Sequence, residues 1–506
     1  MKVDNARQKT IIRAIIVGML VGAVVSSFRW LVELALRTWL VAYDHINNFT
    51  SLLLMLLIFV VLTVVVGKII KGDKNVNGSG IPQVEAELAG KLDVNPFSIF
   101  WRKYVAGLIT IGSGAFLGRE GPSVQLGAAV GEIFATLRKH DRNEKRLLIA
   151  MGSAAGLSAA FGAPLAGSLF ILEEVYRSFS LLVWLGTLTS AIFSDIVSSY
   201  VFGLRPVLSI SINHQLSLGT YPLIILVGIG LGILGYVYQW TTLRADKLYK
   251  FFWWLPRQYH FFFVFITILP IGVYWPKLLG GGSGLIANLA IGKQTVLILL
   301  LILLLRFVLS AVAFGSGVPG GIFLPILTLG AVIGAVFGTI FIQLGLIPSD
   351  ELSNMVVLGM VGYFASISKA PFTAIILIAE MVGTMNHLVP MALVALVAYI
   401  TIDLLGGEPI YESLLAKLNI PTKLDKFKGR LEKMTVIVSP HSKLADQAIR
   451  QLDISKEALI QQVIRGGKTY LPKGDFVLAS GDELILLTDE SQWSQIWDTF
   501  NELNKG

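Results

Sequence analysis

Long apolar runs dominate this chain and narrow the folds open to it. Hydrophobic residues make up 54% of its 506 residues and charged residues 15%, whereas about a quarter of the residues of a soluble domain are charged. An apolar run of roughly 18 residues or more is long enough to cross a bilayer as a helix. The sequence therefore predicts an all-α polytopic membrane protein rather than a large soluble one. The candidate spans lie at residues 14–25 extended by 30–41, 51–66, 181–199, 222–238, 296–305 with flanks, 324–346 and 388–405.

Glycine and proline interrupt these runs. Fifty glycines and 18 prolines lie largely inside the apolar regions. Backbone that leaves a helix within a bilayer must be buried in protein or line a wet cavity. The breaks between apolar runs are therefore the first candidates for a functional site.

The sequence offers little for enzyme chemistry. It contains no cysteine, which excludes disulfides and thiol chemistry. Its six histidines lack metal-ligand spacing, no glycine-rich stretch matches a P-loop, and no nucleophile–base set is recognisable. We therefore expect no enzyme activity, no metal and no cofactor.

The N-terminal segment is basic before it becomes apolar. Lys2, Arg7, Lys9 and Arg13 stand at its start, and no A-x-A-like cleavage site follows. The positive-inside rule then predicts a retained helix that starts in the cytoplasm. We expect a multi-pass protein of the cell membrane with both termini cytoplasmic. No basic–aromatic surface pattern indicates a nucleic-acid partner, so the net charge of +8 is assigned to cytoplasmic loops.

The composition changes near Ala416, after which charges recur every few residues. Residues 1–416 are predicted to form the membrane domain, 417–430 a linker, and 431–506 a small cytoplasmic α/β domain. In this last domain, turn-separated β-rich runs and one apolar-periodic stretch indicate the elements. We expect strands at residues 434–438, 459–464, 475–478 and 483–487 and a helix at 442–452.

The membrane part repeats itself weakly. Residues 163–173 resemble 370–380, and residues 126–131 resemble 329–334, in the same order and at nearly the same offset. Duplication with a site at the repeat interface is a common transporter plan. We expect two repeats, at about 11–205 and 222–405, and these residues alone leave open whether the repeats are inverted.

Three segments, at residues 78–82, 118–122 and 315–325, combine glycines and a proline with a following apolar run. Glycine lets the backbone approach a ligand closely, and proline suits a helix start. The free amides and the dipole of a helix N-terminus bind an anion without a formal cation. Such binding is weak enough for the ion to leave again, and the hydroxyls of Ser79 and Tyr411 are candidate neutral ligands.

Ionisable side chains in apolar surroundings are usually functional. Glu120 lies in the second of these segments beside Arg119, either as a carboxylate that competes with the anion or as half of an Arg–Glu structural pair. Lys103 precedes this segment and either supplies a positive field or extends to the membrane surface.

Three further acidic residues lie at the ends of apolar runs. Glu173 and Glu174 are adjacent, and one of them is expected to cap or pair at a helix end. Glu380 occupies the matching place in the second repeat, where no comparable glycine-rich segment accompanies it. We therefore expect Glu380 to be structural.

Residues 78–82 (GSGIP), 118–122 (GREGP) and 320–325 (GGIFLP) resemble the signature segments of the CLC family of chloride channels and transporters. Their order and spacing match, and the resemblance covers roughly residues 10–415. It implies a homodimer with one anion path per subunit. It also implies an inverted-repeat architecture in which helix N-termini meet in mid-membrane.

The resemblance also implies roles for individual residues. Ser79 and Tyr411 would bind chloride through hydroxyls, and Ile322 and Phe323 through backbone N–H groups. Glu120 would be the external gating glutamate and Glu174 the internal proton-transfer glutamate. The supporting residues would be Gly78, Gly80, Pro82, Lys103, Arg119, Gly121 and Pro122.

Ser79 bears on selectivity, because nitrate-preferring relatives tend to have proline at this position and fluoride exporters methionine. Residues 463–467, 472–475 and 480–484 resemble the turns of the TrkA-C module, the C-terminal lobe of regulator-of-potassium-conductance domains. That resemblance implies a dimerising regulatory domain with a small cytoplasmic ligand.

The favoured hypothesis is proton/chloride antiport through the membrane, with chloride and protons as the only transported ions. A passive chloride channel is the main alternative, and a fluoride/proton antiporter fits Ser79 less well. An intramembrane enzyme lacks a nucleophile or metal set. A pure sensor, with the C-terminal domain as its working part, is the remaining alternative.

Overall fold

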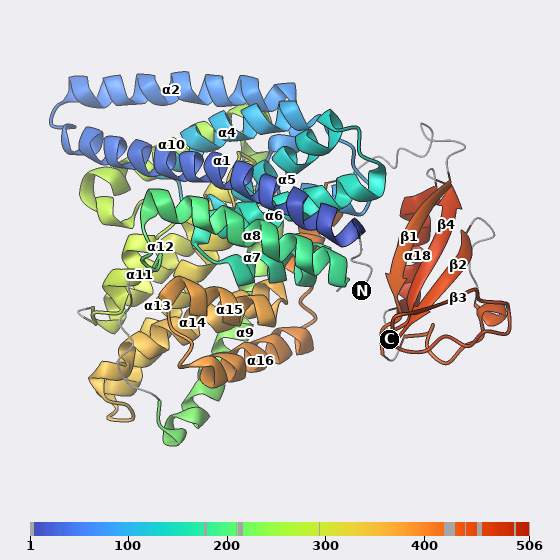
Figure 1. Cartoon of the computed structure of the whole chain (residues 1–506). Helices are drawn as coiled ribbons and strands as arrows, with labels where there is room; N and C mark the ends of the chain where they lie inside the picture. The colour runs from blue at the N-terminus through green and yellow to red at the C-terminus, as the bar shows by residue number, and fades with distance from the viewer. Residues whose placement is uncertain are drawn as a thin grey trace.

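The computed structural model describes residues 5–176, 180–208, 210, 216–292, 294–418, 431–440, 442–452, 458–489 and 492–504. A large helical part, which ends at residue 418, precedes a small part that contains a sheet (Figure 1). The predicted linker at 417–430 lies outside the described residues except for Lys417 and Leu418. In Figure 1 the small part lies beside the end of the large part that carries the N-terminus, and we name this end the tail side.

Seven helical stretches among the described residues are long and apolar enough to cross a bilayer. The predicted spans fall in six of them and in the shorter apolar helix α16. The stretch Ser349–Ser368 was not predicted, because its mean hydropathy is only 1.2. In the structure this stretch is entirely surrounded by protein, so it does not need an apolar face toward lipid. The elements of this part are α1 (Asn5–Asp44), α2 (Phe49–Gly72), α3 (Ile81–Leu88), α4 (Pro96–Gly112), α5 (Glu120–Leu137), α6 (Arg142–Phe161), α7 (Pro164–Phe170), the π-helical turn η2 (Ile171–Val175), α8 (Leu181–Phe202), α9 (Tyr221–Arg244), η4 (Ala245–Phe252), η5 (Arg257–Tyr259), α10 (Phe261–Tyr274), α11 (Ser283–Leu289), α12 (Val296–Gly315), α13 (Phe323–Gln343), α14 (Leu352–Ser368), α15 (Pro371–Val382), α16 (Leu388–Leu404) and α17 (Ile410–Ala416).

Glycines bring two pairs of helices together in the same way. A Cβ added to Gly127 on α5 would overlap the carbonyl oxygen of Gly152 on α6. A Cβ added to Gly330 on α13 would overlap the carbonyl oxygen of Gly359 on α14. Small residues let membrane helices pack backbone to backbone. Gly127 and Gly330 belong to the two repeated segments 126–131 and 329–334, so both copies serve the same helix contact.

Glutamates at the ends of α7 and α15 cap each other's helix. Glu380, near the end of α15, accepts hydrogen bonds of 3.1 and 2.8 Å from two amides in the first turn of α7. Glu173, just after α7, accepts bonds of 3.2 and 2.8 Å from two amides in the first turn of α15. The two helices therefore run antiparallel and exchange caps. This geometry relates α7 and α15 by a local two-fold rotation, and it gives Glu380 the expected structural role.

Glu380→Gln is expected to lower the free energy of unfolding by about 1 kcal/mol, because an uncharged amide interacts less with the dipole of α7. Thermal unfolding of the purified protein in detergent measures this loss. Asp44→Asn removes an exposed carboxylate at the end of α1 and should change stability much less. Equal stability of the two variants would contradict the capping role.

Among its described residues, the small C-terminal part contains an antiparallel sheet with strand order β1-β4-β2-β3, one α-helix and a short 3-10 turn at Ile449–Gln451. Side chains alternate between buried and half-buried along β4, as a strand with one face on a core requires. Met434, Leu484, Leu486 and Phe500 are among the residues of this core. Its elements are β1 (Leu431–Ile437), β2 (Ala458–Arg465), β3 (Lys468–Tyr470), β4 (Glu483–Asp489) and α18 (Trp493–Asn504).

Two predicted elements of this part are wrong. The helix expected at 442–452 is not formed, because backbone bonds from Asp446, Ile449 and Arg450 run to the segment 474–478 instead of along a helix. The strand expected at 475–478 is reduced to an isolated bridge between Ala448 and Val477. Both segments are apolar and buried in part, but they satisfy their backbone groups against each other.

An ion pair between a half-buried arginine and a buried aspartate fixes the turn before β4. Arg465 Nε and Nη2 each donate to the carboxylate of Asp482 at 2.7 Å, and the amide of Ala479 donates to it at 2.8 Å. Burial acts to raise the pKa of Asp482, but the hydrogen bonds and charge of Arg465 hold that pKa below its usual value. Asp482 therefore stays ionised at neutral pH and ties β2 to the turn.

Candidate functional site

The three glycine-rich segments meet at the centre of the membrane domain. The amides of Gly118 and Gly321 each donate to the other residue's carbonyl at 2.7 Å. Gly78 accepts a bond of 3.0 Å from the amide of Gly320 and donates one of 3.2 Å to the carbonyl of Gly317. The reciprocal pair between Gly118 and Gly321 joins equivalent positions of the two repeats. These backbone bonds place all three segments at one point.

Three helices begin at this point. α3, α5 and α13 start at Ile81, Glu120 and Phe323, within the three glycine-rich segments. None of the three has a side-chain cap at its N-terminus. Their first-turn amides therefore remain available, and the three dipoles place partial positive charge around the junction. This is a site for an anion.

Two hydroxyl groups reach the same region without a partner in the described part of the chain. Ser79 precedes the N-cap residue of α3 and Tyr411 lies in the first turn of α17. Both side chains are buried, and neither Ser79 Oγ nor the Tyr411 hydroxyl forms a hydrogen bond. Buried polar atoms are nearly always bonded. Two orphan hydroxyls at helix N-termini indicate a missing polar ligand.

Glu120 occupies the junction itself. Its side chain is fully buried, and its carboxylate faces backbone amides, among them that of Leu324, rather than a side-chain partner among the described residues. A Cβ added to Gly118 would overlap Glu120 Oε2 and would lie 3.1 Å from the amide nitrogen of Leu324. The carboxylate therefore sits beside the first turn of α13, where an anion would be attracted.

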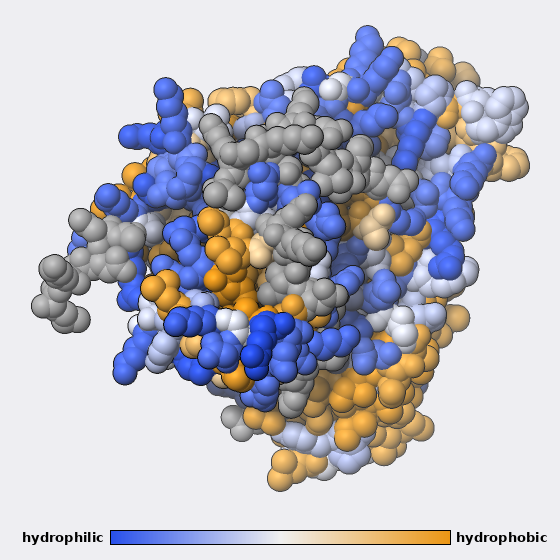
Figure 2. Space-filling view, turned by 90° about the vertical axis from the view of Figure 1, so that its right-hand side faces the viewer, coloured by the Kyte–Doolittle hydropathy of each residue, from blue (hydrophilic) through white to orange (hydrophobic). Residues whose placement is uncertain are grey.

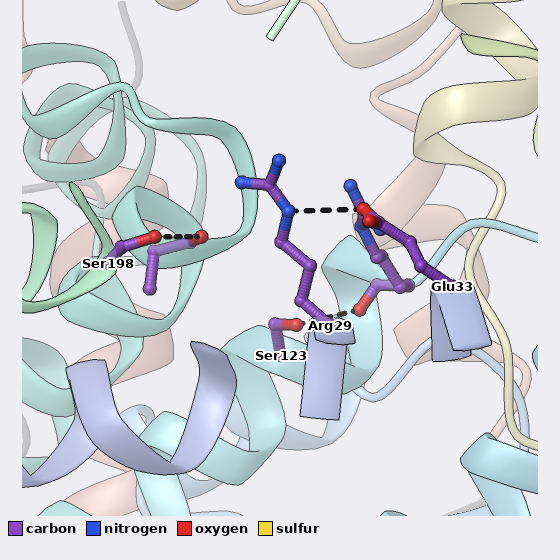
Figure 3. A network of polar contacts seen from close by, with 6 residues as sticks. Arg29, Glu33, Ser123 and Ser198 are labelled. Atoms are coloured by element: carbon purple, nitrogen blue, oxygen red, sulfur yellow. Dashed lines mark hydrogen bonds and ion pairs between the residues drawn. The ribbon is translucent and has the colours of Figure 1, made fainter. Parts of the chain in front are cut away.

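Arg119 does not pair with Glu120. Its Nη1 lies 2.7 Å from Oε1 of Glu33 on α1, and the same oxygen accepts a bond of 3.3 Å from Arg29 Nε (Figure 3). The backbone carbonyl of Arg119 accepts from Ser123 Oγ at 2.9 Å. The alternative of an Arg119–Glu120 structural pair is therefore wrong. Glu33, which the sequence reading did not single out, holds Arg119 instead.

Lys103 is completely buried and holds the first glycine-rich segment. Its Nζ donates to the carbonyls of Val76 at 2.9 Å and Gly78 at 2.8 Å. The alternative in which Lys103 extends to the membrane surface is therefore wrong. Arg306 on α12 is equally buried and donates to the carbonyls of Leu278, Gly280 and Gly281 at 2.8 to 2.9 Å.

Arg306 is the second-repeat counterpart of Lys103, because both lie 15 positions before the paired glycines, Gly321 and Gly118 (321 − 306 and 118 − 103). Each fixes the turn before a short helix, α3 for Lys103 and α11 for Arg306. The sequence reading missed Arg306, although a lone charge within the apolar run Val296–Gly315 was available as a signal.

Glu173 and Glu174 have separate places. Glu173 caps α15, as described above, whereas Glu174 is buried in the π-helical turn η2. Single π turns occur frequently at functional sites. Tyr411 lies within electrostatic reach of both Glu174 and Glu120. The hydroxyl of Tyr411 is therefore placed near two acids that belong to different helices of the first repeat.

A cavity of about 610 Å³ leads from Ser79 and Gly78 toward the tail side. Lys74, Arg257 and Lys417 line it, and Lys417 pairs with Asp246 at 3.0 Å. Figure 2, which looks onto the tail side, shows hydrophilic residues over much of this face and a hydrophobic area at its lower right margin. The basic residues give the cavity a positive field that concentrates anions.

The family model described as "Voltage gated chloride channel" matches residues 63–403. The chain belongs to this CLC family. The match confirms the predicted fold class and identifies a multi-pass membrane protein of chloride transport rather than an enzyme. The TrkA-C domain model matches residues 434–500, which confirms the predicted resemblance of the C-terminal domain to TrkA-C.

Individual relatives agree with this assignment. The CLC chain is 32% identical over 431 residues to the H(+)/Cl(-) exchange transporter ClcA of Vibrio cholerae, covering 81% of this chain and 90% of that one. It is 33% identical over 439 residues to the protein of the same name from Salmonella arizonae, covering 82% and 89%.

Solved structures share the fold. The crystal structure of a slow cyanobacterial Cl-/H+ antiporter superposes with a TM-score of 0.76 at 28% identity, covering 81% of this chain and 97% of that one. A CLC-type fluoride/proton antiporter superposes with a TM-score of 0.65 at 21% identity, covering 79% and 96%.

Proposed function

We propose that this CLC protein is a proton/chloride antiporter in which a glutamate and chloride compete for one site. The observation that carries the proposal is the convergence of Ser79, Tyr411 and Glu120. The hydroxyls of Ser79 and Tyr411 are buried without a hydrogen-bond partner in the described part of the chain, and the buried Glu120 carboxylate lies beside the first turn of α13, where uncapped helices begin. The relatives named above as H+/Cl- exchangers support the coupling to protons.

Chloride binds to neutral and dipolar groups in this proposal. The hydroxyls of Ser79 and Tyr411 donate to it, together with the amides of Ile322 and Phe323 at the start of α13. No formal cation touches the ion, so it leaves readily in either direction. The cavity on the tail side, with its basic lining, delivers chloride to Ser79.

Glu120 and chloride exclude each other. Ionised, the carboxylate occupies the anion position beside α13, and the place of Glu120 Oε2 near the first turn of that helix supports this. When it takes a proton from the side opposite the tail, it loses its attraction to the helix dipoles and chloride replaces it. Glu174 exchanges that proton with the tail side. Alternation of chloride and carboxylate at one site couples the two flows.

The supporting residues keep the site open. A Cβ added to Gly121 would overlap the Ser79 hydroxyl, and one added to Gly80, at φ +97°, would overlap Gln125. Pro82 and Pro122 lie in the first turns of α3 and α5, where a missing N–H is tolerated. Gly78 joins the segments, Lys103 holds Gly78, and the bond to Glu33 turns Arg119 away from Glu120.

The assembly follows from the family resemblance and belongs to the same proposal. Residues 1–416 form the transporting unit, with repeats at about 11–205 and 222–405, and two copies make a homodimer with separate paths. The tail side is cytoplasmic in the cell membrane, because Arg7, Lys9 and Arg13 lie at the start of α1. Residues 431–506 form a regulatory domain with a small cytoplasmic ligand.

Chloride efflux from proteoliposomes with simultaneous recording of external pH tests the proposal. Outward chloride flow should drive protons inward, and the external solution should become alkaline. A reversal potential that follows chloride alone, with no change in pH, would establish a passive channel instead. Continued chloride flux after removal of residues beyond Leu418 would exclude a pure sensor, and faster fluoride than chloride flux would indicate a fluoride exporter.

A further inference from the structure

The C-terminal domain meets the membrane domain through α18. The guanidinium carbon of Arg146, on α6, lies 3.3 Å from the centroid of the Trp493 ring on α18. Lys91, in the turn after α3, places its Nζ 2.8 Å from Oδ1 of Asp498, also on α18. Arg146 and Trp493 are both buried. Their cation–π contact is therefore desolvated, which makes it stronger than an exposed one.

A glycine in the membrane domain leaves room for the contact with α18. Gly90, in the turn after α3, has a φ of +72°. A Cβ at this position would lie 2.5 Å from Nη2 of Arg146 and 3.1 Å from the ring of Trp493. Only glycine combines this φ with room for both side chains. The contact is thus close-packed and involves main chain as well as side chains.

A cavity of about 550 Å³ lies beside this contact and has walls from both domains. On the membrane side, Leu88 comes from the end of α3, Tyr176 follows η2, and Leu415 belongs to α17. Trp497 is one of the α18 residues on the opposite wall. The domain interface therefore meets three separate elements of the membrane domain at their ends on the tail side.

These three elements carry the proposed transport residues. α3 begins two residues after Ser79, η2 contains Glu174, and α17 contains Tyr411. α3 contacts both η2 and α17. By contrast, no described residue of α18 lines the cavity that leads to Ser79. α18 therefore lies beside the elements that carry Glu174 and not beside the cavity that leads to Ser79.

We infer that α18 docks on this surface and restricts proton exchange between Glu174 and water on the tail side. The shared cavity is walled by Val175 and Tyr176, which directly follow Glu174 in the chain. Withdrawal of α18 opens this region to solvent, whereas the docked domain narrows it. The inference rests on the proposed function, in which Glu174 carries the proton. The TrkA-C domain would then control the movement of protons through Glu174, which we call the proton branch, separately from the movement of chloride, the chloride branch.

A reversible cross-link across the interface tests the inference in the full-length protein. The chain has no native cysteine, so Lys91→Cys combined with Asp498→Cys places a single thiol pair at the contact. The protein is treated with a short bis-methanethiosulfonate reagent, reconstituted, and assayed before and after a reductant. We expect cross-linking in high yield and coupled exchange slowed by about threefold or more, with recovery after reduction. Each single-cysteine variant should show no response.

The same cross-link in a Glu174→Gln background separates the two branches. Chloride flux without proton coupling should be unaffected there, because α18 acts on the proton branch. Failure to cross-link, or equal slowing in both backgrounds, overturns the inference. A normal exchange ratio with no response to the cross-link overturns it as well and leaves the proposed function standing. Chloride flux without proton movement in the unmodified protein overturns the proposed function itself.

Discussion

Glu174→Gln is expected to abolish proton movement while chloride flux continues. The amide has nearly the same size as the carboxyl group but cannot release and rebind a proton. Because Glu174 is buried in η2 and separate from the helix N-termini that attract the anion, chloride binding should persist. Removal of a proton-transferring group typically lowers the rate of that transfer by about 100-fold or more. Simultaneous chloride and pH recordings from proteoliposomes measure both flows.

Glu173→Gln is the matched control for this experiment. It makes the same chemical change one residue away, at a carboxylate that caps α15 through bonds of 2.8 and 3.2 Å. This variant should keep the exchange ratio and lose about 1 kcal/mol of stability from the weakened cap. An unchanged ratio in Glu174→Gln, or loss of coupling in both variants, would remove Glu174 from the proton path.

The site was accessible from the sequence wherever its residues act through local backbone geometry. Glycine and proline predict a helix start in each of the segments 78–82, 118–122 and 320–325, and α3, α5 and α13 do begin there. The duplicated segments 126–131 and 329–334 predicted a repeat, and both make the same glycine contact. Residue types and their spacing along the chain are sufficient to predict helix starts and repeated segments.

Partners that are distant in sequence were not accessible in this way. The ion pair between Arg119 and Glu33 joins residues 86 positions apart, and no local pattern indicates it. The exchange of caps between Glu173 and α15 spans 199 and 200 positions. The antiparallel arrangement of α7 and α15 follows from this exchange, and no local pattern in the sequence indicates it.

The C-terminal domain illustrates a second limit. Periodic apolar residues at Leu444, Ala448 and Leu452 fit a helix, yet the segment pairs with residues 474–478. Tertiary pairing overrode a weak local preference. The helix α18 was missed, although Trp493, Ile496 and Phe500 follow helical spacing and are buried together. The contacts of α18 with the membrane domain join residues far apart in sequence, so no local sequence pattern predicts them.

Glu120→Gln is expected to make chloride flux independent of pH and to end proton coupling. In the unmodified protein, flux should rise as pH on the side opposite the tail falls through the pKa of Glu120, because protonation releases the carboxyl group from the anion position. Glutamine is neutral at every pH, so it leaves the helix dipoles of α13 to chloride throughout. Chloride flux measured from about pH 5 to pH 8 should therefore be constant in the variant.

The control for this prediction is Glu33→Gln, which neutralises a neighbouring carboxylate without emptying the anion position. Glu33 acts on the site through its ion pairs with Arg119 and Arg29, so its loss leaves Glu120 able to compete with chloride, and flux should still depend on pH. If flux in Glu120→Gln remains strongly pH-dependent, another group gates the path. If both variants lose pH dependence, the ion pairs of Glu33 rather than the competing Glu120 carboxylate control access, because only the Glu120 variant removes the carboxylate that lies beside the first turn of α13.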